Sequence, residues 1–163
     1  MWPMTLIKMV VLRANPQDLP TSTALTLLAV AMYYVADVAT ALMMAPVTNA
    51  LQAAAVDTLL LLALTQTALN LRHQGGRLRQ TIMALAGAGA IMAGVTVALY
   101  SVLPDAILPE VLWMLSALWL FAVYGHVLRQ AFDVSYKAGI AATGLYFVVS
   151  LLLTAPFLIS SQS

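Results

Sequence analysis

Five long apolar stretches, separated by short polar connectors, follow one another along the chain. Each is about as long as the ~20 residues that a helix needs to cross a bilayer. The predicted spans cover residues 21–45, 49–71, 80–103, 110–130 and 135–159. The apolar runs are continuous and show no alternation, which excludes a membrane β-barrel. The pattern therefore predicts an all-α bundle of five transmembrane helices.

A shorter apolar segment precedes the first span. Pro3 suits the first turn of a helix, and Pro16 ends it. Apolar side chains such as Leu6 and Met9 are expected at the headgroup boundary, with Lys8 facing anionic lipid. We therefore predict an interfacial amphipathic helix and connector over residues 1–20, followed by the transmembrane domain over residues 21–163. A frayed terminus is the alternative.

Composition agrees with a membrane protein. Of the 163 residues, 63% are hydrophobic and only 8% are charged, whereas soluble domains carry about a quarter charged residues. So few charges cannot cover the surface of a soluble globule. The chain has no cysteine, which excludes disulfides and thiol chemistry.

The cationic residues are distributed asymmetrically. Every lysine and arginine lies in the N-terminal segment, the second loop or the fourth loop: Lys8, Arg13, Arg72, Arg77, Arg79, Arg129 and Lys137. Cationic loops stay in the cytoplasm, so we expect a cytoplasmic N-terminus and a C-terminus on the outer side. The short, alanine-rich chain and the family resemblance given below favour a bacterial inner membrane, in which that outer side is the periplasm. The last five of these cations are candidates for contact with lipid headgroups or a protein partner. Alternatively, they only set the topology.

Two aspartates interrupt the first two spans. Asp37 and Asp57 each lie ten residues from Val47, at the centre of the predicted turn over residues 45–49. Antiparallel helices joined there would hold both carboxylates at one depth, ~12–15 Å below the turn. An acid so deep in a span is costly and is a functional-site hypothesis.

Two carboxylates at one apolar depth resist ionising together, which favours a shared proton or cation. The candidate residues for this site are Asp37 and Asp57, with hydroxyls from Tyr33 and Thr58. The alternative is that each acid separately hydrogen-bonds a neighbour or reaches water. No lysine or arginine is expected at that depth to form a salt bridge.

Signatures of other functions are missing from the sequence. It contains no zinc-protease, nucleophile-elbow or phosphate-loop motif, so we expect no enzyme activity and no cofactor. His73 and His126 lack nearby acids, which makes a metal site a poor fit. No basic soluble domain is present to bind nucleic acid.

The second half of the chain carries a set of recurring features: Gly75-Gly76 before a helix that opens with Arg79-Gln80-Thr81, a tryptophan at position 119, and Ser135 with Ala138 entering the last span. With these features, residues 75–153 resemble the Yip1-like five-span membrane proteins in their short bacterial form. The long cytosolic N-terminal region of that family is absent. The resemblance implies a non-enzymatic membrane scaffold.

Two functions are therefore expected. The first is an integral membrane scaffold or assembly factor, with basic cytoplasmic loops that contact lipid, a protein partner or a second copy of the chain. The alternative is a small proton- or cation-coupled transporter or channel subunit that uses Asp37 and Asp57.

The predicted orientation can be tested by cysteine labelling, because the chain has no cysteine of its own. In Thr48→Cys, an impermeant thiol reagent should react from the periplasmic side. In Gly76→Cys, it should react only after the membrane is opened. Labelling of residue 48 from the cytoplasm would refute the orientation.

Overall fold

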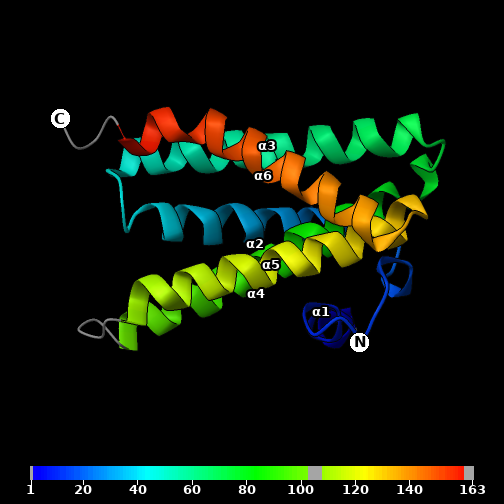
Figure 1. Cartoon of the computed structure of the whole chain (residues 1–163), viewed down its shortest axis with the longest axis horizontal. Helices are drawn as coiled ribbons and strands as arrows, with labels where there is room; N and C mark the ends of the chain where they lie inside the picture. The colour runs from blue at the N-terminus through cyan, green and yellow to red at the C-terminus, as the bar shows by residue number, and fades with distance from the viewer. Residues whose placement is uncertain (1, 103–107, 160–163) are drawn as a thin grey trace.

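The computed structural model describes residues 2–102 and 108–159, and this part of the chain is helical throughout, apart from short connectors. Six α-helices and two 3-10 turns follow one another (Figure 1): α1 (Trp2–Val10), η1 (Pro16–Asp18), α2 (Thr23–Ala41), α3 (Val47–Leu71), η2 (Gly75–Arg77), α4 (Leu78–Val102), α5 (Leu108–Phe132) and α6 (Tyr136–Ile159). The all-α prediction is confirmed for the described residues.

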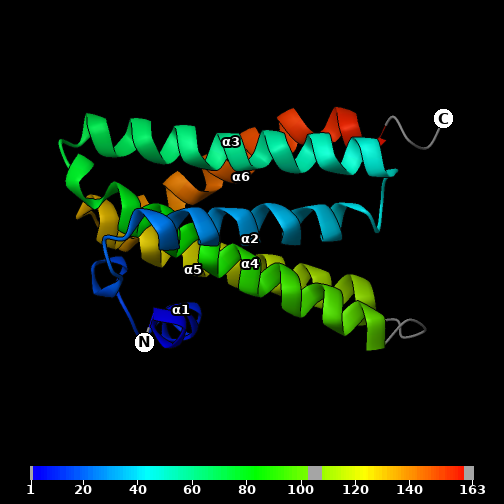
Figure 2. The same ribbon diagram turned by 180° about the vertical axis from the view of Figure 1, so that it is seen from behind.

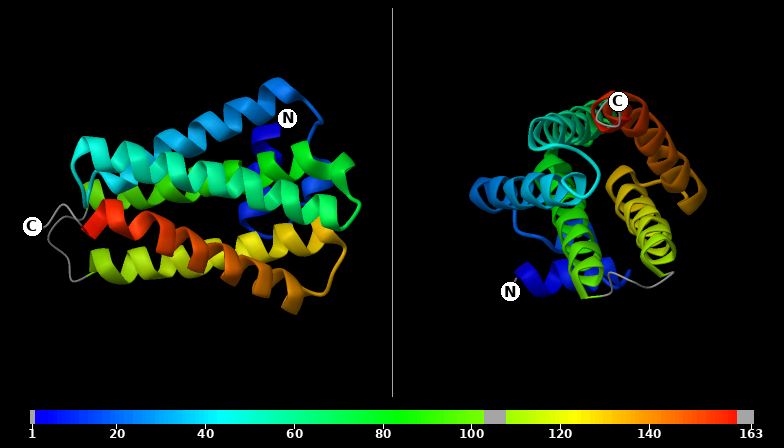
Figure 3. Two further views of the ribbon diagram at one scale, coloured as in Figure 1. Left: turned by 90° about the horizontal axis from the view of Figure 1, so that it is seen from above. Right: turned by 90° about the vertical axis from the view of Figure 1, so that its left-hand side faces the viewer.

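The five long helices form a closed ring. Its order is α3, α6, α5, α4 and α2, with α2 returning to α3, as the end-on view shows (Figure 3). Neighbours in the ring are antiparallel except α2 and α4, since an odd number of alternating helices leaves one parallel pair. Every long helix therefore has one side facing a common centre.

Four of these helices are long and apolar enough to cross a membrane: α2, α3, η2 with α4 over Gly75–Val102, and α6 up to Leu158. They correspond to the first, second, third and fifth predicted spans. The predicted fourth span is the helix α5, and its role as a fifth crossing stays a prediction.

The two ends of the ring differ. At one end lie the α3–α4 turn, the α5–α6 turn and the start of α2 (Figure 1). This end carries Arg72, Arg77, Arg79, Arg129 and Lys137, and we call it the cationic end. The α2–α3 turn lies at the other, which we call the hairpin end. That turn covers residues 42–46, slightly earlier than predicted, because the extended backbone of Pro46 caps α3.

The N-terminal helix is docked on the bundle. It crosses beside α4 and α5 (Figure 2), and its Leu6 and Met9 side chains are buried. The expectation that these two residues face the headgroup boundary is therefore wrong, because they pack against protein. A frayed terminus is also wrong, since Met9 is 0% exposed.

Side chains of α4 and α5 bind the irregular backbone that follows α1. The indole of Trp119 donates to the carbonyl of Val10 at 2.9 Å, and Nε2 of His126 lies 3.2 Å from the carbonyl of Ala14. The Gln80 amide donates to the carbonyl of Leu19 at 2.6 Å. Irregular backbone next to lipid must have its polar groups satisfied by protein, and these bonds do so.

Small residues let the helices approach closely. Residues 81–90 of α4 are all buried, so this part of the helix is surrounded by protein. A Cβ atom at Gly87 would lie 2.7 Å from Cδ1 of Leu6, so the glycine makes room for α1. On α6, a Cβ atom at Gly139 would lie 2.5 Å from the carbonyl oxygen of Gly125. That contact is with backbone, which cannot move as a side chain can.

We therefore expect Gly139→Ala to destabilise the bundle by about 1–3 kcal/mol, the usual cost of overpacking. Gly144→Ala on the same helix is the matched control, because its nearest neighbour would be 3.6 Å away. The measurement is the midpoint of unfolding of the purified proteins in detergent. Equal midpoints for the two variants would contradict the close approach of α5 and α6.

Candidate functional site

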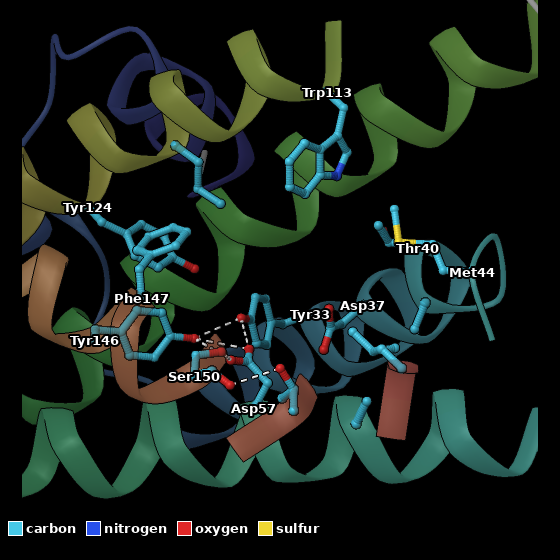
Figure 4. A pocket seen from close by; sticks show the side chains of 15 residues that line it. Tyr33, Asp37, Thr40, Met44, Asp57, Trp113, Tyr124, Tyr146, Phe147 and Ser150 are labelled. Carbon is cyan, nitrogen blue, oxygen red and sulfur yellow. Dashed lines mark hydrogen bonds between the residues drawn. The ribbon is translucent and has the colours of Figure 1, made fainter. Parts of the chain in front are cut away.

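Asp57 lies at the centre of the helical ring. Its side chain is 7% exposed and projects from the buried face of α3. Three hydroxyls donate to the carboxylate (Figure 4): those of Tyr33 on α2, and of Tyr146 and Ser150 on α6. The Tyr146 hydroxyl is 3.0 Å from each carboxylate oxygen and 3.1 Å from the Tyr33 hydroxyl.

This hydroxyl cluster joins three helices through one side chain. Hydrogen bonds to an ionised acceptor are about twice as strong as neutral ones, and they count for more away from water. Both oxygens of Asp57 already have donors, so the carboxylate is satisfied by its own protein. The hydrogen bonds to Asp57 hold α2, α3 and α6 together.

Asp37 has a different environment. It is half-buried on α2, and within residues 2–102 and 108–159 no side chain or backbone group donates a hydrogen bond to it. Its carboxylate instead lines a cavity of about 260 Å³ that also reaches Asp57. A second cavity of about 170 Å³ adjoins the first and is lined by Asp37 as well.

Aromatic and apolar side chains form most of the cavity wall. Trp113, Leu120 and Phe147 border both cavities, while Met44 and Leu158 border the larger one. Met44 lies in the α2–α3 turn and Leu158 near the end of α6, so the cavity runs from the hydroxyl cluster to the hairpin end. Figure 4 shows Asp37 and Trp113 on opposite sides of this space.

Tyr124 closes the cavity toward the cationic end. Its ring centroid is 5.9 Å from that of Tyr146, and both tyrosines also line a separate apolar cavity of about 120 Å³ beyond them. The Tyr124 hydroxyl is buried and has no hydrogen-bond partner among the described residues.

The structure brings together three of the four predicted proton- or cation-site residues, namely Asp37, Asp57 and Tyr33. Tyr33 bonds Asp57 across the bundle rather than Asp37 one turn away. Thr58 is buried on α3 and makes no hydrogen bond through its hydroxyl within the described part of the chain.

Sequence reasoning missed Tyr146 and Ser150. Their spacing of four residues places both on one face of α6, in an otherwise apolar segment. That pattern was the available signal. Nothing in the sequence, however, paired α6 with α3.

Two of the candidate headgroup or partner contacts have partners within the protein. Arg72 donates to the carbonyl of Phe132 at 3.3 Å, and Arg77 donates to that of Ala131 at 3.3 Å. These bonds satisfy carbonyls at the end of α5, where cations are favoured. Arg129 lies over the Tyr136 ring at 5.7 Å. Arg79 and Lys137 are exposed.

No group of three or more metal-ligating side chains gathers in the described part of the chain. Comparisons with protein-family models, with curated proteins and with solved structures found no match. The site must therefore be interpreted from its own geometry.

The two aspartates should respond differently to removal of their charge. Asp57→Leu leaves three hydroxyls without their acceptor and should lower stability by about 1–3 kcal/mol. Asp37→Leu removes no hydrogen bond that the structure shows and should change stability little. Unfolding of both variants in detergent checks this, and an equal loss in the two would contradict the assignment.

Proposed function

We propose that the chain is an integral inner-membrane protein with five spans, its cationic end in the cytoplasm. Four helices of suitable length and apolarity support this, as does the position of α5 beside α4 and α6 in the same ring. The cations Arg72, Arg77 and Lys137 lie at one end. In this orientation the cavity runs toward the periplasm.

The N-terminal helix fits the cytoplasmic leaflet in this arrangement. Leu6 and Met9 pack against the bundle, while Met4 and Ile7 are exposed as apolar side chains suited to lipid. Lys8 is exposed as well, and its long stem allows the charge to reach the headgroups.

The function that the geometry supports best is proton-coupled cation transport, as a small transporter or a channel subunit. The observation that carries this proposal is the cavity, which brings a carboxylate without a hydrogen-bond donor to the centre of a membrane bundle. A carboxylate in such a position is costly unless a proton or cation occupies it. Asp37 would bind and release the ion, and Asp57, held by its three hydroxyl donors, would form the inner end of the site.

Transport also requires a path from the cavity to the opposite side of the membrane. The Tyr124–Tyr146 layer separates the periplasmic cavity from the apolar cavity on the cytoplasmic side. A movement of these rings would join the two cavities. The arrangement thus has the features of a site with access from one side at a time.

A scaffold of the Yip1-like type stays the second proposal. The docked N-terminal segment supports it, because a fixed cytoplasmic surface suits a protein partner. The cavity favours transport, because a scaffold has no use for an unpaired carboxylate in an apolar wall.

The test is proton flux into liposomes that contain the purified protein. A potential imposed with potassium and valinomycin should drive acidification that a trapped pH-sensitive dye reports. Asp37→Asn should abolish this flux, since the amide cannot exchange a proton, and Asp37→Glu should retain part of it.

Asp133→Asn is the matched control, because Asp133 is exposed at the cationic end, where its positive φ of 54° also suits asparagine. Its flux should equal that of the unaltered protein. Flux that is absent from every protein, or unchanged in Asp37→Asn, would overturn the transport proposal and favour the scaffold.

A further inference from the structure

We infer that the cavity beside Asp37 binds an organic ammonium cation rather than a metal ion, with Trp113 and Phe147 as its aromatic contacts. The inference rests on the proposed transport function and names the class of its substrate. It follows from the oxygen atoms that the site offers, from its walls and from its charge.

The cavity has too few free oxygen atoms for a metal ion. A hard cation such as calcium takes about 6–8 oxygen ligands, and magnesium about six in strict geometry. The oxygens of Asp57 are already occupied by hydroxyl donors. The hydroxyls of Thr40 and Thr154, which also line the cavity, donate to the carbonyls of Ala36 and Ser150. Asp37 is the one carboxylate left for a ligand among the described residues of the wall.

The walls suit an organic cation instead. A quaternary or tertiary ammonium needs only one carboxylate, and aromatic faces within about 6 Å attract it, tryptophan most strongly. Trp113 and Phe147 border both cavities together with Asp37. Leu120 and Met44 would contact the hydrocarbon substituents.

The charge pattern supports the same ligand. No lysine or arginine lines either cavity within the described part of the chain, so nothing there competes for Asp37. The cavities, of about 260 and 170 Å³, are each smaller than the ~300–1,000 Å³ typical of small-molecule sites. A compact amine fits this space better than a drug-sized one.

Tyr124 closes the inner end of the site. Its side chain lines the larger cavity, and Figure 4 shows it pointing toward Tyr33. Ligand and proton would then compete for Asp37: the cation binds the carboxylate when the proton has left.

Calorimetry on the purified full chain in detergent tests this, with phenyltrimethylammonium as the probe and its uncharged isostere tert-butylbenzene as the matched control. The ammonium should bind, and its affinity should fall by about tenfold or more in Asp37→Asn and in Trp113→Ala. Binding should weaken as the buffer is made acidic, because the proton displaces the cation. Asp37→Glu should restore part of the affinity, and Asp133→Asn should bind as the unaltered protein does.

Three results would overturn the inference: equal binding of the isostere, unchanged binding in Asp37→Asn, or displacement of the probe by sodium at equal concentration. Variants are compared only when they elute as the unaltered protein does in size exclusion, and Asp37→Glu provides a second variant if Asp37→Asn fails to fold. Proton flux that depends on Asp37 without ammonium binding would leave the transport proposal standing and remove this substrate. Ammonium binding without proton flux would remove the transport proposal and leave the ammonium site standing.

Discussion

The bundle depends on one acceptor that three hydroxyls share. Asp57 joins the consecutive helices α2 and α3 to α6, which is distant from them in the chain. Packing between apolar helices in lipid gains little from the hydrophobic effect, since lipid is as apolar as the side chains. A hydrogen-bonded carboxylate therefore gives this ring a specific arrangement that leucine and alanine cannot give. The same cluster forms the inner wall of the cavity, so the hydrogen bonds that join the helices also border the candidate site.

Much of the fold was predictable because length and apolarity alone specify membrane-length helices. The spans around Asp37 and Asp57 were predicted correctly from the sequence. The order of the helices in the ring could not be predicted, because these helices are apolar on most sides and their sequences do not indicate which helices they pack against. For that reason Tyr146 was missed, although its hydroxyl is the central donor to Asp57. The cavity was not predictable either, since it depends on side chains from four helices.

The N-terminal segment shows a second limit of sequence reasoning. Its pattern predicted a helix with lipid on its apolar side, but Leu6 and Met9 are covered by protein. The reason is the backbone that follows: the carbonyls of Val10 and Ala14 need donors, and Trp119 and His126 provide them. Only the structure shows that they anchor the chain's own beginning.

Two arginines fasten the α3–α4 connector to the end of α5. Arg72 donates to the carbonyl of Phe132, and Arg77 donates to that of Ala131, both at the cationic end of the ring. The larger cavity runs instead toward the hairpin end, where Met44 and Leu158 border it. Under the transport proposal, the helix ends beside the cavity would move more than the ends that these two arginines hold together.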